Sequence, residues 1–145
     1  MTDQSNQQEL LVAVDFSPCS QRAFEAALRW RGDGELTLLH VLDRAVVEQI
    51  EQLGLGSADE ALARMRTRAE DELAQMVADR GAERVETMVV VGEPFVEIVR
   101  IANDLDCDLI VIGIQGREAG IKQLLFGGTA EMVLRAAKQP VLCVP

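Results

Sequence analysis

The chain has 145 residues, of which 48% are hydrophobic, and carries a net charge of −10. This length and apolar content are typical of one globular domain with its own core, so we expect a single domain over residues 1–145. The acidity argues against nucleic acid and anionic membranes as partners, because proteins that bind their phosphates generally present a basic face.

Predicted strands and helices alternate along the chain. In order, they are a strand over 9–15, a helix over 18–30, a strand over 35–42, a helix over 57–80, a strand over 84–91, a helix over 95–105, a strand over 108–113, a helix over 129–138 and a strand over 140–145. Several strand segments are apolar throughout, which is typical of strands buried on both faces of a parallel sheet. The order predicts an α/β fold, a doubly wound (Rossmann-like) five-stranded parallel sheet flanked by four helices in a three-layer sandwich.

The first predicted helix has the clearest start signal. Ser17 is a favourable N-cap, and Pro18 suits the first position of the helix over 18–30. By contrast, the segment 43–56 is the least regular part of the chain, and the glycines near its end predict a mobile connection.

The three cysteines indicate a reducing compartment. Cys19, Cys107 and Cys143 form no C-x-x-C pair, and their number is odd, which favours free thiols over a disulfide framework. The first residues lack the basic segment of a signal peptide, and no uncharged apolar run approaches the ~20 residues needed to span a bilayer. We therefore expect a cytoplasmic protein.

Five of the eleven glycines lie between residues 113 and 133, where a predicted strand leads into a predicted helix. Ligands of a doubly wound sheet bind outside the carboxyl ends of its strands, which here are Asp15, His40–Val41 and Gly113. A glycine-rich turn and a helix N-terminus can both direct N–H groups at a phosphate, even on an acidic protein. Glycines also end strands and form turns without binding anything, so this pattern leaves both interpretations open.

Four stretches in order along the chain resemble the universal stress protein family. They are "LVAVDFSPCSQRAFEAAL" at 11–28, "LLHVLD" at 38–43, "VVVGEPFVEIVRIANDLDCDLIVIG" at 89–113 and "GGTAEMVLRAAKQPVLCVP" at 127–145. The nucleotide-binding branch of that family carries G-x2-G-x9-G-[S/T] after its fourth strand. Gly113, Gly116 and Gly127 match the three glycines, but ten residues separate the second from the third. Gly128 stands where Ser or Thr is expected.

The resemblance implies a set of nucleotide contacts. Asp15 would approach the adenine or the ribose, and the backbone of Val41 would meet the adenine edge. Ile112 and Gly113 would line the ribose region. The residues implied around the phosphates are Gly116, Gly127, Gly128 and Thr129.

The resemblance further implies a regulatory stress-response protein that binds ATP, or AMP or ADP, with Mg or Mn beside a triphosphate. It also implies a homodimer formed through the C-terminal strand, Pro140–Val144. No catalytic residue and no dedicated metal-ligand cluster is visible in the sequence. Two alternatives remain, a family member that acts through protein partners without nucleotide, and a slow nucleotide hydrolase.

Some single residues have two interpretations. Asp15 could contact a ligand or cap the helix over 18–30. His40, the only histidine, could be a base or a packed strand residue. Cys19 could be redox-sensitive or simply a small helix residue, and Arg117 or Lys122 could reach a phosphate or face solvent.

Overall fold

The computed structural model describes residues 8–115 and 128–145. The elements are β1 (Glu9–Ala13), α1 (Pro18–Trp30), β2 (Glu35–Asp43), α2 (Arg44–Gln52), α3 (Ala58–Arg80), β3 (Val85–Gly92), α4 (Pro94–Asp104), β4 (Leu109–Gly113), α5 (Gly128–Ala136) and β5 (Val141–Val144). None of the helices in these two stretches combines the length and apolar character needed to cross a bilayer.

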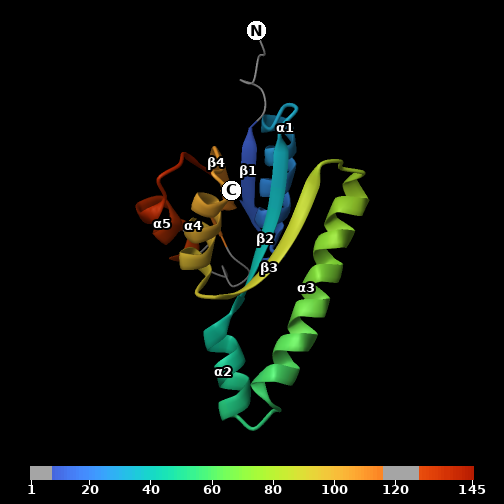
Figure 1. Cartoon of the computed structure of the whole chain (residues 1–145), viewed down its shortest axis with the longest axis vertical. Coiled ribbons are helices and arrows are strands. Elements are labelled where there is room, and N and C mark those ends of the chain that lie inside the picture. The colour runs from blue at the N-terminus through green and yellow to red at the C-terminus, as the bar shows by residue number, and fades with distance from the viewer. Residues whose placement is uncertain (1–7, 116–127) are drawn as a thin grey trace.

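The strands form one five-stranded sheet in the order β3-β2-β1-β4-β5, with every neighbouring pair parallel. The central strand β1 pairs with β2 on one side and β4 on the other, so that Val12 lies between Leu38 and Val111. The chain therefore winds outward from β1 in both directions. This arrangement confirms the predicted doubly wound α/β fold (Figure 1).

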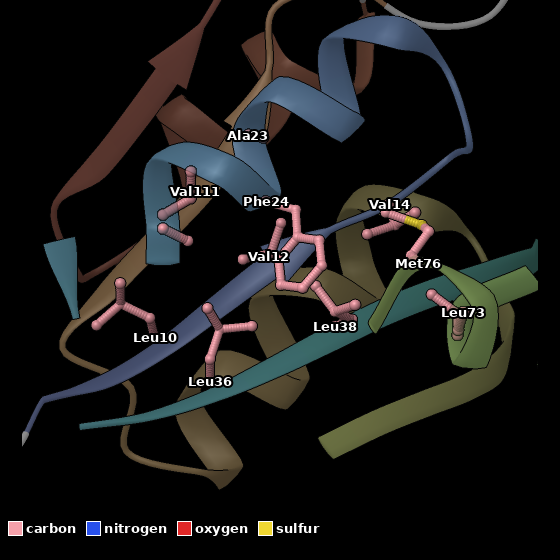
Figure 2. Close-up of a cluster of buried hydrophobic side chains, with 11 residues drawn as sticks. Leu10, Val12, Val14, Ala23, Phe24, Leu36, Leu38, Leu73, Met76 and Val111 are labelled. Carbon is pink, nitrogen blue, oxygen red and sulfur yellow. The ribbon is translucent and has the colours of Figure 1, made fainter. Parts of the chain in front are cut away.

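Helices cover both faces of the sheet and bury a separate apolar cluster on each. On the first face, α1 and α3 pack over alternate residues of the strands, with Phe24, Leu73 and Val12 in the same cluster (Figure 2). On the second face, α4 and α5 contribute Ile98 and Val133 to the other cluster. Because successive strand side chains point to opposite faces, a central strand is buried on both of them, and Leu10, Leu11, Val12 and Ala13 of β1 are all apolar and buried.

The described residues contain five helices rather than the predicted four, because α2 lies within the segment expected to be irregular. The Asp43 carboxylate accepts a hydrogen bond from the Ala45 N–H at 3.0 Å and so caps this helix. Val47 is its buried residue. Together α2 and the first half of α3 form a helical hairpin that extends beyond the sheet (Figure 1). The mobility predicted for the glycine-containing turn between them stays a prediction.

The two edges of the sheet differ. At the β3 edge, the Arg66 guanidinium of α3 donates a hydrogen bond to the Val89 carbonyl at 2.8 Å. At the other edge, β5 pairs with β4 on one side, and no strand of the described residues pairs with its outer side. All four residues of β5 are half-buried.

Candidate functional site

A pocket of about 180 Å³ opens at the carboxyl ends of β1, β2 and β4, beside the first turns of α4 and α5. The strand order reverses at β1, and the crevice at such a reversal is where doubly wound sheets bind their ligands. The topology therefore places the pocket where ligand chemistry is expected.

Six of the eight residues implied by the family resemblance line this pocket. They are Asp15, Val41, Ile112, Gly113, Gly128 and Thr129. The other two, Gly116 and Gly127, lie outside the described residues, as do Arg117 and Lys122. The fold thus brings together residues that are up to 114 positions apart, from Asp15 to Thr129.

The turn from β1 to α1 shapes the wall that contains Asp15. Ser17, not Asp15, caps α1, because the Ser17 hydroxyl accepts a hydrogen bond from the Ser20 N–H at 3.2 Å. Asp15 instead accepts the Ser17 N–H on Oδ1 at 3.0 Å, which closes a local turn. Its other oxygen, Oδ2, has no hydrogen-bond partner among the described residues. The carboxylate can therefore organise the turn and still offer an acceptor to a ligand.

His40 also lines the pocket, from the end of β2. Its Nδ1 lies 2.6 Å from the Val14 carbonyl oxygen, and because a carbonyl can only accept, Nδ1 is the protonated nitrogen that donates. Its ring centroid lies 4.7 Å from that of Phe16. The ring is half-buried, so His40 is both a packed strand residue and part of the pocket wall.

Much of the remaining wall is apolar. Leu39 and Ile112 come from the strands, and Pro94 and Ile98 come from the first turns of α4. Apolar walls with a few convergent polar groups are typical of sites for small organic ligands. Neither Pro94 nor Ile98 is predicted from the sequence as a site residue, although both lie on one face of a helix that follows a buried strand.

The start of α5 supplies the polar end of the pocket. Gly128 and Thr129 are its first two residues, and both are exposed. The first N–H groups of a helix have no partner within the helix, and the helix dipole makes that end attractive to anions. A Cβ added at Gly128 would meet no atom of the described residues within 4 Å, so these residues leave room for a side chain at this position.

Two side chains with shifted pKa values, Glu97 and Cys107, are not among the residues that line the pocket. The Arg100 guanidinium hydrogen-bonds Glu97 at 2.8 Å and lowers the pKa of that carboxyl. Burial raises the pKa of the Cys107 thiol to about 11, so this cysteine stays protonated near neutral pH. Glu97 and Arg100 thus form an ion pair on the surface of α4, and Cys107 is a buried core residue.

Comparison with known proteins identifies the family. The model of the "Universal stress protein family" matches residues 7–145, nearly the whole chain. The chain belongs to the universal stress protein family. Universal stress protein YxiE of Bacillus subtilis is 30% identical over 145 residues, an alignment that covers 94% of this chain and 97% of YxiE.

Solved structures of other universal stress proteins share this fold. The structure of MJ0577 from Methanocaldococcus jannaschii is 27% identical, covers 94% of each chain and superposes with a TM-score of 0.81. A universal stress protein crystallised in complex with cAMP is 25% identical, with a TM-score of 0.63, and the match covers 95% of this chain and 96% of that one. Universal stress proteins of this architecture therefore include one that binds an adenine nucleotide.

Within the universal stress protein glycine motif, Gly113 has a packing role that holds with or without a ligand. A Cβ at this position would lie 2.6 Å from the Cys19 Cβ and 2.9 Å from the Cys19 carbonyl carbon. A glycine is therefore required for the first turn of α1 to pack against the end of β4. The same contact buries Cys19, which is 4% exposed. This burial favours the interpretation of Cys19 as a small packing residue.

Within residues 8–115 and 128–145, no group of three or more His, Cys, Asp or Glu side chains is arranged to hold a metal ion.

Proposed function

We propose that this universal stress protein binds an adenine nucleotide, ATP, ADP or AMP, in the pocket at the ends of β1, β2 and β4. The observation that carries the proposal is the convergence, in one pocket, of apolar walls, the Asp15 carboxylate and the first turn of α5. Binding would serve a regulatory role in a cytoplasmic stress response. The three free cysteines, all within the described residues, suit such a reducing compartment.

Each part of the pocket suits a different part of the nucleotide. The flat adenine would lie between apolar side chains of the pocket wall such as Ile98 and Ile112, with the backbone of Val41 at its edge. Asp15 Oδ2 would accept a hydrogen bond from a ribose hydroxyl or from the adenine amino group. The N–H groups at Gly128 and Thr129 would meet the phosphates. Mg²⁺ or Mn²⁺ would accompany a triphosphate, held by its oxygens.

Isothermal titration calorimetry with ATP, ADP and AMP, each with and without magnesium, tests the proposal. We expect saturable binding of one nucleotide per chain. A flat titration at millimolar ATP with magnesium would contradict the proposal and would favour a family member that acts through protein partners.

Replacing Gly128 with serine is expected to tighten ATP binding about tenfold, because the added hydroxyl can donate a hydrogen bond to a charged phosphate oxygen. The part of the chain that the structure describes leaves room for it, since an added Cβ meets none of those atoms within 4 Å. Calorimetric titration of the variant gives the dissociation constant. Gly128→Ala is the matched control, because it adds the Cβ and stiffens the helix start without adding a hydroxyl. Equal affinities in the two variants would contradict a phosphate at this position.

We also propose that the chain forms a two-fold homodimer through Pro140–Val144. The outer side of β5 is open among the described residues, whereas an arginine of α3 bonds to a carbonyl at the β3 edge. Open strand edges are prone to pair with another chain, and pairing of two identical edges gives a closed, symmetric assembly.

The Cys143→Pro variant is expected to be monomeric, with a mass by sedimentation near the 15.9 kDa of one chain. Ile110 and Ile114 of the β4 segment donate to the Pro140 and Val144 carbonyls, at 3.0 and 2.9 Å. Bonding residues alternate along a parallel strand, so the Cys143 N–H faces the outer edge, where proline removes a donor without breaking the β4 ladder. Unchanged circular dichroism would confirm folding, and a dimeric variant or a monomeric wild type would contradict the proposed interface.

A further inference from the structure

The turn that presents Asp15 to the pocket contains an unfavourable backbone conformation. Phe16 has a φ of 65°, in the left-handed region that residues with a Cβ seldom adopt. The turn contains no glycine that could relieve this cost. Contacts from outside the turn must therefore stabilise it, because such conformations persist only where the surroundings hold them.

His40 provides contacts on both sides of Asp15. Its Nδ1–H donates to the carbonyl of Val14, the residue before Asp15, at 2.6 Å. Its ring lies against Phe16, the residue after Asp15, with 4.7 Å between the centroids and 40° between the planes. One side chain from β2 thus contacts both residues that flank Asp15 in the sequence.

The hydrogen bond to Val14 extends the sheet beyond its last paired residues. The β1–β2 register ends at Ala13 and Leu39, and the Val14 N–H donates to the Leu39 carbonyl at 2.8 Å. The His40 imidazole then supplies the donor for the Val14 carbonyl. Val14 is 4% exposed, and a buried carbonyl that loses its donor is costly.

We propose that His40 is a positioning residue of the nucleotide site. Its imidazole holds the β1–α1 turn in the shape that directs Asp15 into the pocket, and it thereby sets the affinity for the nucleoside part of the ligand. The inference rests on the proposed nucleotide binding and adds a residue that the family motif does not contain. The role is exerted through Asp15 and not through a direct contact with the ligand.

Three substitutions separate the hydrogen bond to Val14 from the ring contact with Phe16. His40→Asn keeps an N–H donor near the position of Nδ1 and loses the ring. His40→Phe keeps a ring and leaves the Val14 carbonyl without its donor. His40→Ala removes both. Adenosine titrations should show binding weakened roughly tenfold in His40→Phe and His40→Ala, with most of that loss restored in His40→Asn. Equal affinity in wild type and His40→Phe would overturn the inference and leave nucleotide binding intact.

A double-mutant cycle with Asp15→Ala tests whether His40 acts through the carboxylate. If it does, His40→Phe weakens adenosine binding in the wild-type background and has little further effect once Asp15 is alanine. An equal effect in both backgrounds would overturn the inference, because it would mean that His40 acts on the ligand directly.

Amide hydrogen exchange in the ligand-free protein gives a readout that needs no nucleotide. The Ser17 N–H donates to Asp15 Oδ1, so its exchange rate reports on the shape of the turn. His40→Phe should speed exchange at Ser17 while the amides of α3 keep their protection. Unchanged exchange at Ser17 would overturn the inference. If the wild-type protein bound no nucleotide but the Ser17 amide exchanged faster in His40→Phe, the proposed function would be wrong. The part of the inference that concerns the shape of the turn would still hold.

Discussion

Replacing Phe24 with alanine is expected to lower the free energy of unfolding by about 3–5 kcal/mol, the range for a large aromatic side chain removed from a well-packed core. Phe24 is 0% exposed on α1, and its ring lies among Val12, Leu38 and Met76 in the cluster between α1, α3 and the sheet (Figure 2). The Arg80 guanidinium carbon also lies 5.1 Å from the ring centroid, so the substitution removes a cation–π contact as well.

Urea denaturation followed by circular dichroism measures this loss. Trp30→Ala is the matched control, because Trp30 is an aromatic residue of the same helix but is 60% exposed. Its removal should change the unfolding free energy by no more than about 0.5 kcal/mol. If the two variants lost similar amounts of stability, the cluster around Phe24 would not be the main core on that face of the sheet.

The strands of the sheet are buried on both faces, and this burial is the reason that the sheet could be predicted from the sequence. A strand such as β1 is covered by α1 and α3 on one face and by α4 and α5 on the other, so Leu11 and Val12 are both 0% exposed although they point to opposite faces. Short apolar runs without alternation, bounded by turn residues and repeated between helical segments, therefore indicate the strands of a parallel sheet.

The sequence does not predict helix α2, because little of this helix is buried. Val47 is its buried residue, and Val46 is 43% exposed, so the apolar pattern that identifies a core-facing helix is weak. Its start signal was present in Asp43, whose carboxylate caps the helix. That aspartate also ends β2, and a strand leading directly into a helix leaves no turn residues by which to recognise the boundary.

The site was predictable to the extent that strand ends define it. Asp15, Val41 and Gly113 follow from where buried strands stop, since the carboxyl ends of parallel strands meet at one edge of the sheet. Pro94 and Ile98 line the pocket from the start of α4, and Ile98 also belongs to the core cluster of the second face, so sequence periodicity does not distinguish a pocket wall from a core. The resemblance places Gly113 beside the ribose, and the structure adds a packing reason for this glycine, since a Cβ there would clash with Cys19.

The Asp15→Asn variant is expected to bind adenine nucleotides about 10–100-fold more weakly while its turn stays intact. Asparagine keeps a carbonyl oxygen that can accept the Ser17 N–H, as Asp15 Oδ1 does at 3.0 Å. The second oxygen becomes an NH₂ group, so a ribose hydroxyl or adenine amino group that donated to it loses its acceptor and faces a donor. Calorimetric titration with ATP and adenosine measures the change, and both should weaken together because the contact is to the nucleoside part.

Two further variants distinguish this contact from the other roles of the carboxylate. Asp15→Ala also removes the acceptor for Ser17, so it should lower the unfolding free energy by about 1 kcal/mol in addition to weakening binding. Asp71→Asn changes the net charge by the same amount at an exposed position on α3 and measures the general effect of reduced acidity on an anionic ligand. That general effect can only strengthen ATP binding, because a negative charge has been removed. Weaker binding in Asp15→Asn therefore requires a specific contact, whereas affinity equal to that of Asp71→Asn would restrict Asp15 to shaping the turn.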